Sequence, residues 1–191
     1  MYWTLIKSHI RDFAQDTRGT IMVETVLSLP LLIMGLTAMF EFFEIHRFQS
    51  ARDKATYTIA DMISRENDVI TDIYIDNAKI LFDEIADDYA DNQIRISIIE
   101  FDGTNNEYQV NWSEIRGTGG MDVLKDSDVR DDTANLPVLN DGEELILVES
   151  EAKYKTIFEI GFDDNMTVET RVFTSIRFAP QMCFDACQSE S

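Results

Sequence analysis

A continuous apolar segment dominates the N-terminal third of the chain. From Ile21 to Phe40 the only charged residue is Glu24. A helix of this length, at about 1.5 Å of rise per residue, covers the roughly 30 Å hydrocarbon core of a bilayer. The segment therefore predicts a membrane-spanning anchor.

Beyond the apolar segment the pattern becomes amphipathic, with no Gly or Pro between Leu36 and Arg65. Apolar residues recur at spacings of three and four, which is typical of a helix with one buried face. They are Phe42, Ile45, Phe48, Ala51, Ala55, Ile59, Met62 and Ile63, and the polar positions between them include Arg47, Gln49, Arg52, Asp53 and Lys54. We expect one helix from about Ile21 to Arg65, kinked by Pro30.

The rest of the chain predicts a second helix followed by strands. A helical stripe covers Thr71 to Ala90, and the period then changes to that of a hairpin with strands at Gln93 to Phe101 and Tyr108 to Trp112. Residues 116 to 143 read as loop. Alternation predicts strands at Ile146 to Phe158 and Thr167 to Phe178, joined by a turn at residues 163 to 165. The fold class expected is α+β: a long N-terminal helix, a second helix and an antiparallel sheet of about four strands.

Charge separates the anchor from the domain that follows it. Residues 1 to 60 hold six basic and six acidic residues, whereas residues 61 to 191 hold ten basic and thirty acidic residues, so the net charge of −20 lies in the second part. Such a domain repels nucleic acid, which excludes a nucleic-acid partner. We divide the chain into a leader-like segment at 1–19, a long helix at 20–65 and an acidic domain at 66–191.

Basic residues before the span set its orientation. Lys7, Arg11 and Arg18 precede it, whereas the first basic residue after it is Arg47. Cations stay on the cytoplasmic side, so the N-terminus should be cytoplasmic and the acidic domain exported. A cleaved secretory signal is the alternative, but the apolar run is longer than such a signal and lacks a good cleavage site.

Two cysteines, Cys183 and Cys187, lie close to the C-terminus. In an exported domain a closely spaced pair is typical of a disulfide. The alternative is a zinc site, but no His lies near enough to complete it. We expect a disulfide that holds the C-terminal tail.

No sequence motif for catalysis or cofactor binding is present, and residues 61 to 191 contain no His. We therefore expect no enzyme activity, no cofactor and no metal site. The acidic residues Asp122, Asp126, Asp128, Asp131 and Asp132 could hold calcium, but they lack the EF-hand pattern, and a solvated acidic loop is the interpretation we favour.

Glu24 requires an explanation, because a carboxylate inside a membrane segment costs about 2.5 to 3.5 kcal/mol. It lies in the stretch Arg18-Gly19-Thr20-Ile21-Met22-Val23-Glu24, followed by Leu29-Pro30-Leu31-Leu32, Glu41-Phe42 and the long helix to Arg65. This region resembles the TadE/TadG-like proteins of tight-adherence (Flp, type IVc) pilus systems. In prepilin-related members a prepilin peptidase cuts after a glycine, and a glutamate lies fifth in the mature chain.

The resemblance implies roles for three residues of this chain. Cleavage after Gly19 would leave Thr20 as the new N-terminus and Glu24 as its fifth residue. The resemblance further implies that Glu24 pairs with the N-terminal amine of a neighbouring subunit, which is physically sensible because a lone charge in lipid is costly. Partners would then be a prepilin peptidase, other pilin-like subunits and pilus assembly proteins.

Chain length excludes a major pilin, which is very short in these systems, so the resemblance implies a non-enzymatic minor pilin-like component (a pseudopilin). Its location would be the bacterial inner membrane, with the acidic domain in the periplasm. The alternative function is an uncleaved, membrane-anchored binding module whose acidic domain binds a ligand such as a cation. The N-terminus of the mature protein separates the two hypotheses.

Overall fold

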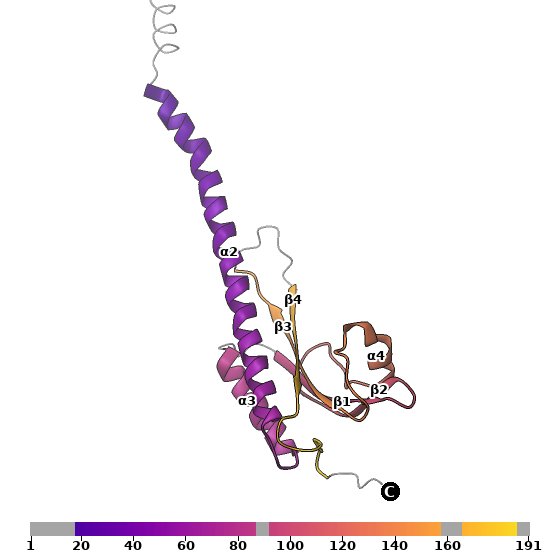
Figure 1. Cartoon of the computed structure of the whole chain (residues 1–191). Coiled ribbons are helices and arrows are strands. Elements are labelled where there is room, and N and C mark those ends of the chain that lie inside the picture. The colour runs from indigo at the N-terminus through magenta and orange to yellow at the C-terminus, as the bar shows by residue number, and fades with distance from the viewer. Residues whose placement is uncertain (1–17, 87–91, 158–165, 187–191) are drawn as a thin grey trace, which may run out of the picture. The chain divides into compact units, whose positions relative to one another are not determined.

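The computed structural model describes residues 18–86, 92–157 and 166–186 (Figure 1). Two helices come first, α2 (Arg18–Ser64) and α3 (Asp72–Ala86). The strands and shorter helices that follow are β1 (Asn92–Asp102), β2 (Glu107–Gly117), α4 (Asp126–Asp131), the 3₁₀ helix η1 (Thr133–Asn135), β3 (Glu144–Tyr154) and β4 (Met166–Ser175). The α+β class with a long helix, a second helix and a four-stranded antiparallel sheet is confirmed.

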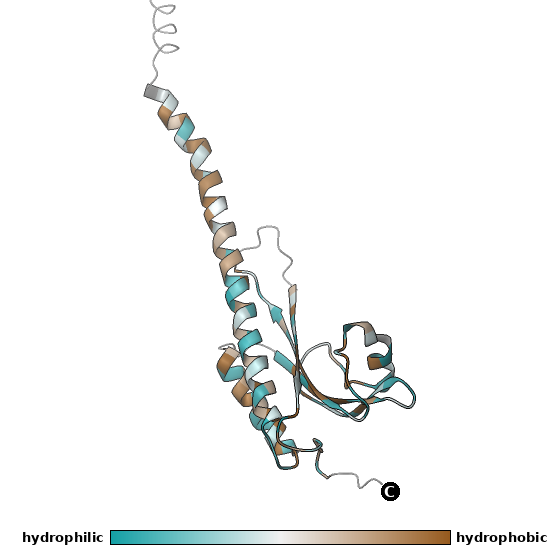
Figure 2. Cartoon of the chain, in the orientation of Figure 1, coloured by the Kyte–Doolittle hydropathy of each residue, from teal (hydrophilic) through white to brown (hydrophobic). Residues whose placement is uncertain are grey.

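The chain divides into two compact units, and the boundary between Phe43 and Glu44 lies within helix α2. Figure 2 shows mainly hydrophobic residues in the first half of α2 and a mixture of hydrophobic and hydrophilic residues in the second half. The second unit contains the end of α2, helix α3 and the whole sheet. The amphipathic part of α2 is therefore an element of the folded unit.

The sheet has the strand order β2-β1-β3-β4, and every neighbouring pair is antiparallel. The predicted hairpin forms between β1 and β2, where the Asp102 carboxylate accepts hydrogen bonds from the backbone N–H groups of Thr104 and Asn105. Such local bonds close the turn and allow Asn106 to take a positive φ of 56°. The central pairing of β1 with β3 joins segments about fifty residues apart.

A β-bulge in β2 changes which side chains share a face of the sheet. Ile98 pairs with Trp112, whereas Ile99 pairs with Val110, so Asn111 is the extra residue. Trp112 consequently packs with the core beneath the helices, while Val110 and Tyr108 pack on the opposite face. The sequence pattern treated these three apolar residues as one alternating set, and the bulge corrects that interpretation.

Helices α2 and α3 cover one face of the sheet. Ala55, Ile59 and Ile63 of α2 are fully buried, as the spacing predicted. They share a core with residues of α3 and of the two central strands, β1 and β3, including Ile75, Phe82, Ile94, Ile96, Ile146 and Val148. Hydroxyl contacts add specific links, because Thr170 of β4 donates to Asp53 at 2.9 Å and the Thr56 and Ser150 hydroxyls lie 3.2 Å apart.

Arg52 does not follow the predicted pattern. It was placed among the polar positions of α2, yet its side chain is fully buried. Its guanidinium carbon lies 3.2 Å from the centre of the Phe48 ring, and Nη2 donates to Oδ1 of Asn92 at 2.8 Å. A buried cation needs such partners, and a helical repeat cannot show that β1 supplies one.

The opposite face of the sheet is covered by the segment that the sequence predicted as loop. It contains α4 and η1, so this part of the prediction was incomplete. Apolar residues of this segment form a second core with β1, β2 and β3, which includes Leu124, Val129, Leu136, Leu139, Tyr108 and Leu147. The folded unit therefore has helices on one face of its sheet and a long, structured connection on the other.

Observed element bounds differ slightly from those predicted. Helix α3 begins at Asp72 and is described to Ala86, strand β3 ends at Tyr154 rather than Phe158, and β4 ends at Ser175 rather than Phe178. The predicted turn at residues 163 to 165 lies outside the described residues. A long N-terminal apolar helix packed on an antiparallel sheet is a pilin-like topology.

Candidate functional site: the exposed apolar helix and its carboxylate

The apolar half of α2 exposes almost all of its side chains. Thirteen large apolar residues between Ile21 and Phe40 are 49 to 73% exposed. By length and composition α2 is able to cross a membrane, and it is the one helix among the described residues that can do so. A contiguous apolar surface of this size is typical of a surface that contacts a membrane or another protein, and not of one exposed to water.

The Thr25 and Thr37 hydroxyls of the apolar segment are satisfied within the helix. The Thr25 hydroxyl donates to the carbonyl of Ile21 at 2.7 Å, and the Thr37 hydroxyl donates to the carbonyl of Ile33 at 2.8 Å. Both bonds reach back four residues, so each hydroxyl is satisfied by the backbone of its own helix. The helix continues through Pro30, which removes one backbone donor.

Glu24 lies one helical turn after Thr20, and both residues are exposed. Positions four apart share a helix face, so Thr20 and Glu24 lie on the same side of α2. Ile21 and Leu27, three residues to either side of Glu24 and near it on the helix surface, are 70% and 66% exposed. Glu24 is thus the one charged residue of an exposed apolar segment, where a cationic partner would stabilise it.

Gly19 lies in open space in the first described turn of α2. A Cβ added there would meet no heavy atom within 4 Å. The structure places Gly19, Thr20 and Glu24 within two turns of one helix, and their proposed roles stay predictions.

The C-terminal segment is held by two hydrogen bonds to the sheet and by two to Ile70, in the connection between α2 and α3. Trp112 donates from Nε1 to the carbonyl of Met182 at 2.8 Å, and the Met182 N–H donates to Oε2 of Glu144 at 2.7 Å. Ile70 donates its N–H to the carbonyl of Cys183 at 2.9 Å and accepts from the N–H of Asp185 at 2.8 Å. Cys187 lies outside the described residues, so the predicted disulfide stays a prediction.

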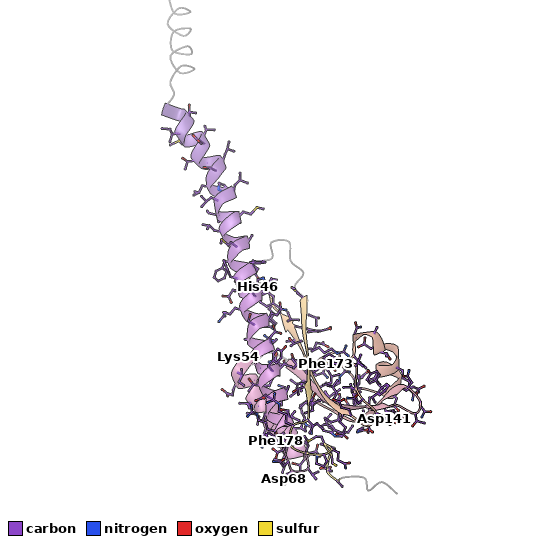
Figure 3. All side chains as sticks on the ribbon, in the orientation of Figure 1. His46, Lys54, Asp68, Asp141, Phe173 and Phe178 are labelled. Atoms are coloured by element: carbon purple, nitrogen blue, oxygen red, sulfur yellow. The ribbon has the colours of Figure 1, made fainter. Side chains whose placement is uncertain are left out.

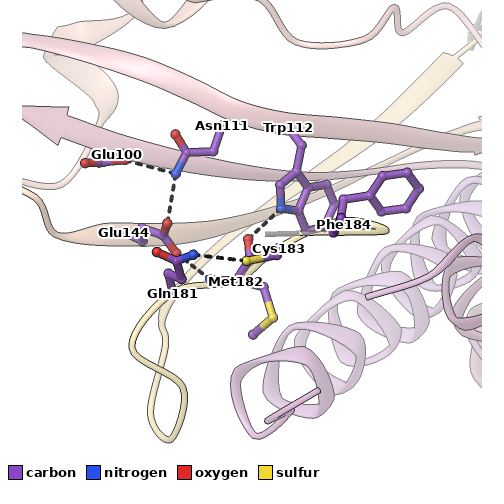
Figure 4. Close-up of a pocket in the computed structure, with 9 residues that line it drawn as sticks. Glu100, Asn111, Trp112, Glu144, Gln181, Met182, Cys183 and Phe184 are labelled. Atoms are coloured by element: carbon purple, nitrogen blue, oxygen red, sulfur yellow. Dashed lines mark hydrogen bonds between the residues drawn. The ribbon is translucent and has the colours of Figure 1, made fainter. Parts of the chain in front are cut away.

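Next to this segment is a cavity of about 400 Å³ that the sequence did not indicate (Figure 4). Glu100 and Glu144 lie opposite each other on β1 and β3, and Asn111 donates from Nδ2 to both carboxylates, at 3.0 and 2.8 Å. Burial raises the pKa of Glu144, and the nearby charge of Glu100 adds to that effect. Asn111 is the bulged residue of β2. The pairing of β1 with β3 brings the two carboxylates together, and the bulge places the Asn111 amide beside them.

Three of the acidic residues considered for calcium, Asp126, Asp128 and Asp132, bind to the protein itself. Asp126 accepts from the N–H of Val110 at 2.8 Å, and Asp128 accepts from the N–H of Lys125 at 3.0 Å at the start of α4. Asp132 accepts from Asn135 and pairs with Arg171, and these contacts lower its pKa. Within residues 18–86, 92–157 and 166–186 no group of three His, Cys, Asp or Glu side chains could hold a metal ion.

A polar network lies on the face of the sheet that the long connection covers. Glu149 is buried between Arg95, whose Nη2 lies 2.6 Å from Oε2, and Arg171, whose Nε lies 3.1 Å from Oε1. Arg95 also donates to the carbonyl of Asp122 at 2.7 Å. Arg171 also pairs with Asp132. Because Arg95 and Arg171 lie on strands and Asp122 and Asp132 lie in the long connection, the network attaches that connection to the sheet.

Comparison of the chain with protein-family models, with curated proteins and with solved structures finds no match.

Proposed function

We propose that this chain is a non-enzymatic minor pilin-like subunit of a tight-adherence pilus machine. It is held in the bacterial inner membrane by α2, with its acidic unit in the periplasm. Its partners are other pilin-like subunits, pilus assembly proteins and a prepilin peptidase. It acts by lateral packing of α2 in the membrane and by presenting the folded unit to those partners.

The observation that carries this proposal is the exposed apolar surface of α2. The side chains from Ile21 to Phe40 have no protein core of their own in the described residues, whereas Ala55, Ile59 and Ile63 of the same helix are fully buried. One helix thus supplies both an apolar surface for lipid or neighbouring helices and a structural element of the folded unit. That combination supports a subunit that moves from a membrane into an assembly.

Glu24 gives the proposal a specific chemical step. In a membrane its carboxylate needs a cation, and cleavage after Gly19 would create one at the amine of Thr20. On a neighbouring subunit that amine would neutralise Glu24 in a medium of low dielectric constant. Removing one partner of a buried ion pair costs about 3 to 5 kcal/mol, so the pair would favour assembly over free subunits.

The experiment that tests the proposal is the substitution Glu24→Gln in the full chain. Membrane abundance and surface piliation, or co-purification of pilus components, are measured in the same cells. We expect normal or higher abundance, because a neutral side chain inserts more easily, together with loss of assembly. Glu44→Gln is the matched control: it makes the same change in the same helix outside the apolar segment, where Glu44 pairs with Arg47 at 2.9 Å.

Normal assembly of the Glu24→Gln protein would contradict the role of Glu24. Equal loss of assembly in both variants would show a general effect of charge on the helix rather than a pairing site. An intact N-terminus together with normal membrane abundance would favour the uncleaved, membrane-anchored binding module.

A further inference from the structure

Helix α2 presents a basic stripe within the folded unit. Arg47, Lys54 and Arg65 are exposed, and their spacings of seven and eleven residues place them on one line along the helix. Arg47 and Arg65 pair with carboxylates of their own helix, Glu44 and Asp61. Lys54, on the side of α2 away from the sheet in Figure 3, has no ion-pair partner among the described residues.

Helix α3 presents a face of the opposite character. Ile73 and Ile80 lie in line, two turns apart, and are 72% and 61% exposed. Asp72, Asp76 and Glu84 surround them and are also exposed. Lys79 of α3 is largely buried and pairs with Asp83, and Arg116 of β2 pairs with Asp72 and Asp76. Glu84 is the carboxylate of this face that has no ion-pair partner among the described residues.

A hydrogen-bonded chain fixes the level of α3 along α2. Arg52 of α2 donates to Asn92 at 2.8 Å, and Asn92 donates to Asp83 of α3 at 3.3 Å. Because α3 begins only eight residues after α2 ends, it runs back along α2 in the opposite direction (Figure 1). Along the axis of α2, Lys54 therefore lies at about the same height as Glu84 of α3. In the same way Tyr57 lies near the height of Ile80, and Arg65 lies near the height of Asp72.

We infer that the basic stripe of α2 binds the acidic and apolar face of α3 in a second copy of this chain. The inference rests on the proposed function, because a common membrane would hold neighbouring copies in one orientation and at one depth. Lys54 then meets Glu84 of the neighbour, and Tyr57, which is 63% exposed, meets Ile80. The contact removes the exposed isoleucines from water and pairs Lys54 with Glu84, neither of which has an ion-pair partner among the described residues of one chain.

Charge also selects the symmetry of this contact. Two α3 faces brought together would leave both Glu84 carboxylates without a cation, whereas a contact between the α2 stripe and the α3 face gives Glu84 the opposite charge of Lys54. Joining an α2 stripe to an α3 face leaves the other two faces free for further copies. This is a head-to-tail contact, which repeats along one direction instead of closing into a pair.

Charge exchange tests the inference on the full chain in lipid nanodiscs or detergent. We measure self-association by analytical ultracentrifugation for the wild type, Lys54→Glu, Glu84→Lys and the double variant. Each single variant should weaken association at least about fivefold, the double variant should restore it, and salt should weaken the wild-type contact. Lys153→Glu is the matched control, because it changes the net charge equally at an exposed lysine on β3, and it should associate as the wild type does.

Chemical cross-linking gives a second readout on the unchanged sequence. A carbodiimide joins an amine to a carboxylate in contact, and a mixture of ¹⁴N and ¹⁵N chains separates links between copies from links within one. Mass spectrometry should find Lys54 joined to Glu84 in mixed-isotope peptides. A monomeric wild type, equal effects of Lys54→Glu and Lys153→Glu, or no recovery in the double variant would overturn the inference.

These outcomes are distinguishable from failure of the proposed function. Retention of residues 1 to 19, with the charge-exchange pattern intact, would remove the pilin-like role and leave the α2–α3 contact. Processing at Gly19 and loss of assembly in Glu24→Gln, without that pattern, would leave the pilin-like role and remove the contact.

Discussion

Arg52 and Asn92 join the long helix to the sheet: Nη2 of Arg52 donates to Oδ1 of Asn92 at 2.8 Å. The Arg52 side chain is fully buried, and its guanidinium stacks on the ring of Phe48. Asn92 is the first residue of β1 and donates in turn to Asp83 of α3. Three elements therefore meet at one buried cation.

Substitution of Arg52 by alanine should destabilise the folded unit strongly. It removes a large buried side chain and leaves the Asn92 amide without one partner, so we expect the free energy of unfolding to fall by about 2 to 4 kcal/mol. Denaturant unfolding of the full chain measures this change. Arg47→Ala is the matched control, because the Arg47 side chain is 74% exposed, and it should change stability by less than about 0.5 kcal/mol. Equal effects of the two substitutions would contradict the structural role of Arg52.

The same residue shows where prediction from the sequence ends. Spacing identified Ala55, Ile59 and Ile63 as the buried face of α2, because helical periodicity is local. It assigned Arg52 to the polar face, since its partner Asn92 lies forty residues away in the sequence. Local patterns predicted the elements and the fold class, but not the polar contacts between elements.

Strand β2 gives a second example. Alternation correctly predicted the hairpin, yet one bulge at Asn111 sends Trp112 to one face of the sheet and Val110 to the other. A single inserted residue leaves no clear mark on the hydrophobic pattern. The cluster of Glu100, Asn111 and Glu144 was missed for this reason, and because the pairing of β1 with β3 is non-local.

Glu144 should give the folded unit a component of stability that decreases as pH rises. Burial raises its pKa above the ordinary value of 4.5, so the folded state holds this proton more tightly than the unfolded state does. Stability from this group is present below pH 4.5 and is lost as pH rises through the folded pKa. In Glu144→Gln that loss should disappear. We compare denaturant unfolding of the two proteins between pH 4 and pH 8.

Glu143, the preceding residue, is the matched control with the opposite sign. Hydrogen bonds from the backbone and side chain of Asn140 lower its pKa below 4.5. Its contribution is therefore present above pH 4.5 and is lost as pH falls through the folded pKa. Should Glu144→Gln and Glu143→Gln shift the pH profile in the same direction, the account of Glu144 is wrong.

Membrane orientation is open to a direct protease test. Basic residues before the apolar segment predict that residues 1 to 18 stay cytoplasmic and that residues 66 to 191 are exported. Protease added to spheroplasts should digest the acidic unit, while a cytoplasmic marker protein stays intact. Protection of the acidic unit until lysis would reverse the orientation.

Prepilin-type processing at Gly19 is the most direct consequence of the proposed function. We purify the full chain from cells with and without the peptidase and determine the N-terminus by mass spectrometry. Gly19→Leu, at a position where a Cβ meets no atom within 4 Å, leaves the helix unobstructed and should block cleavage. The proposal predicts a chain that begins at Thr20 only when the peptidase and Gly19 are both present. A chain that retains residues 1 to 19 in the presence of the peptidase would contradict it.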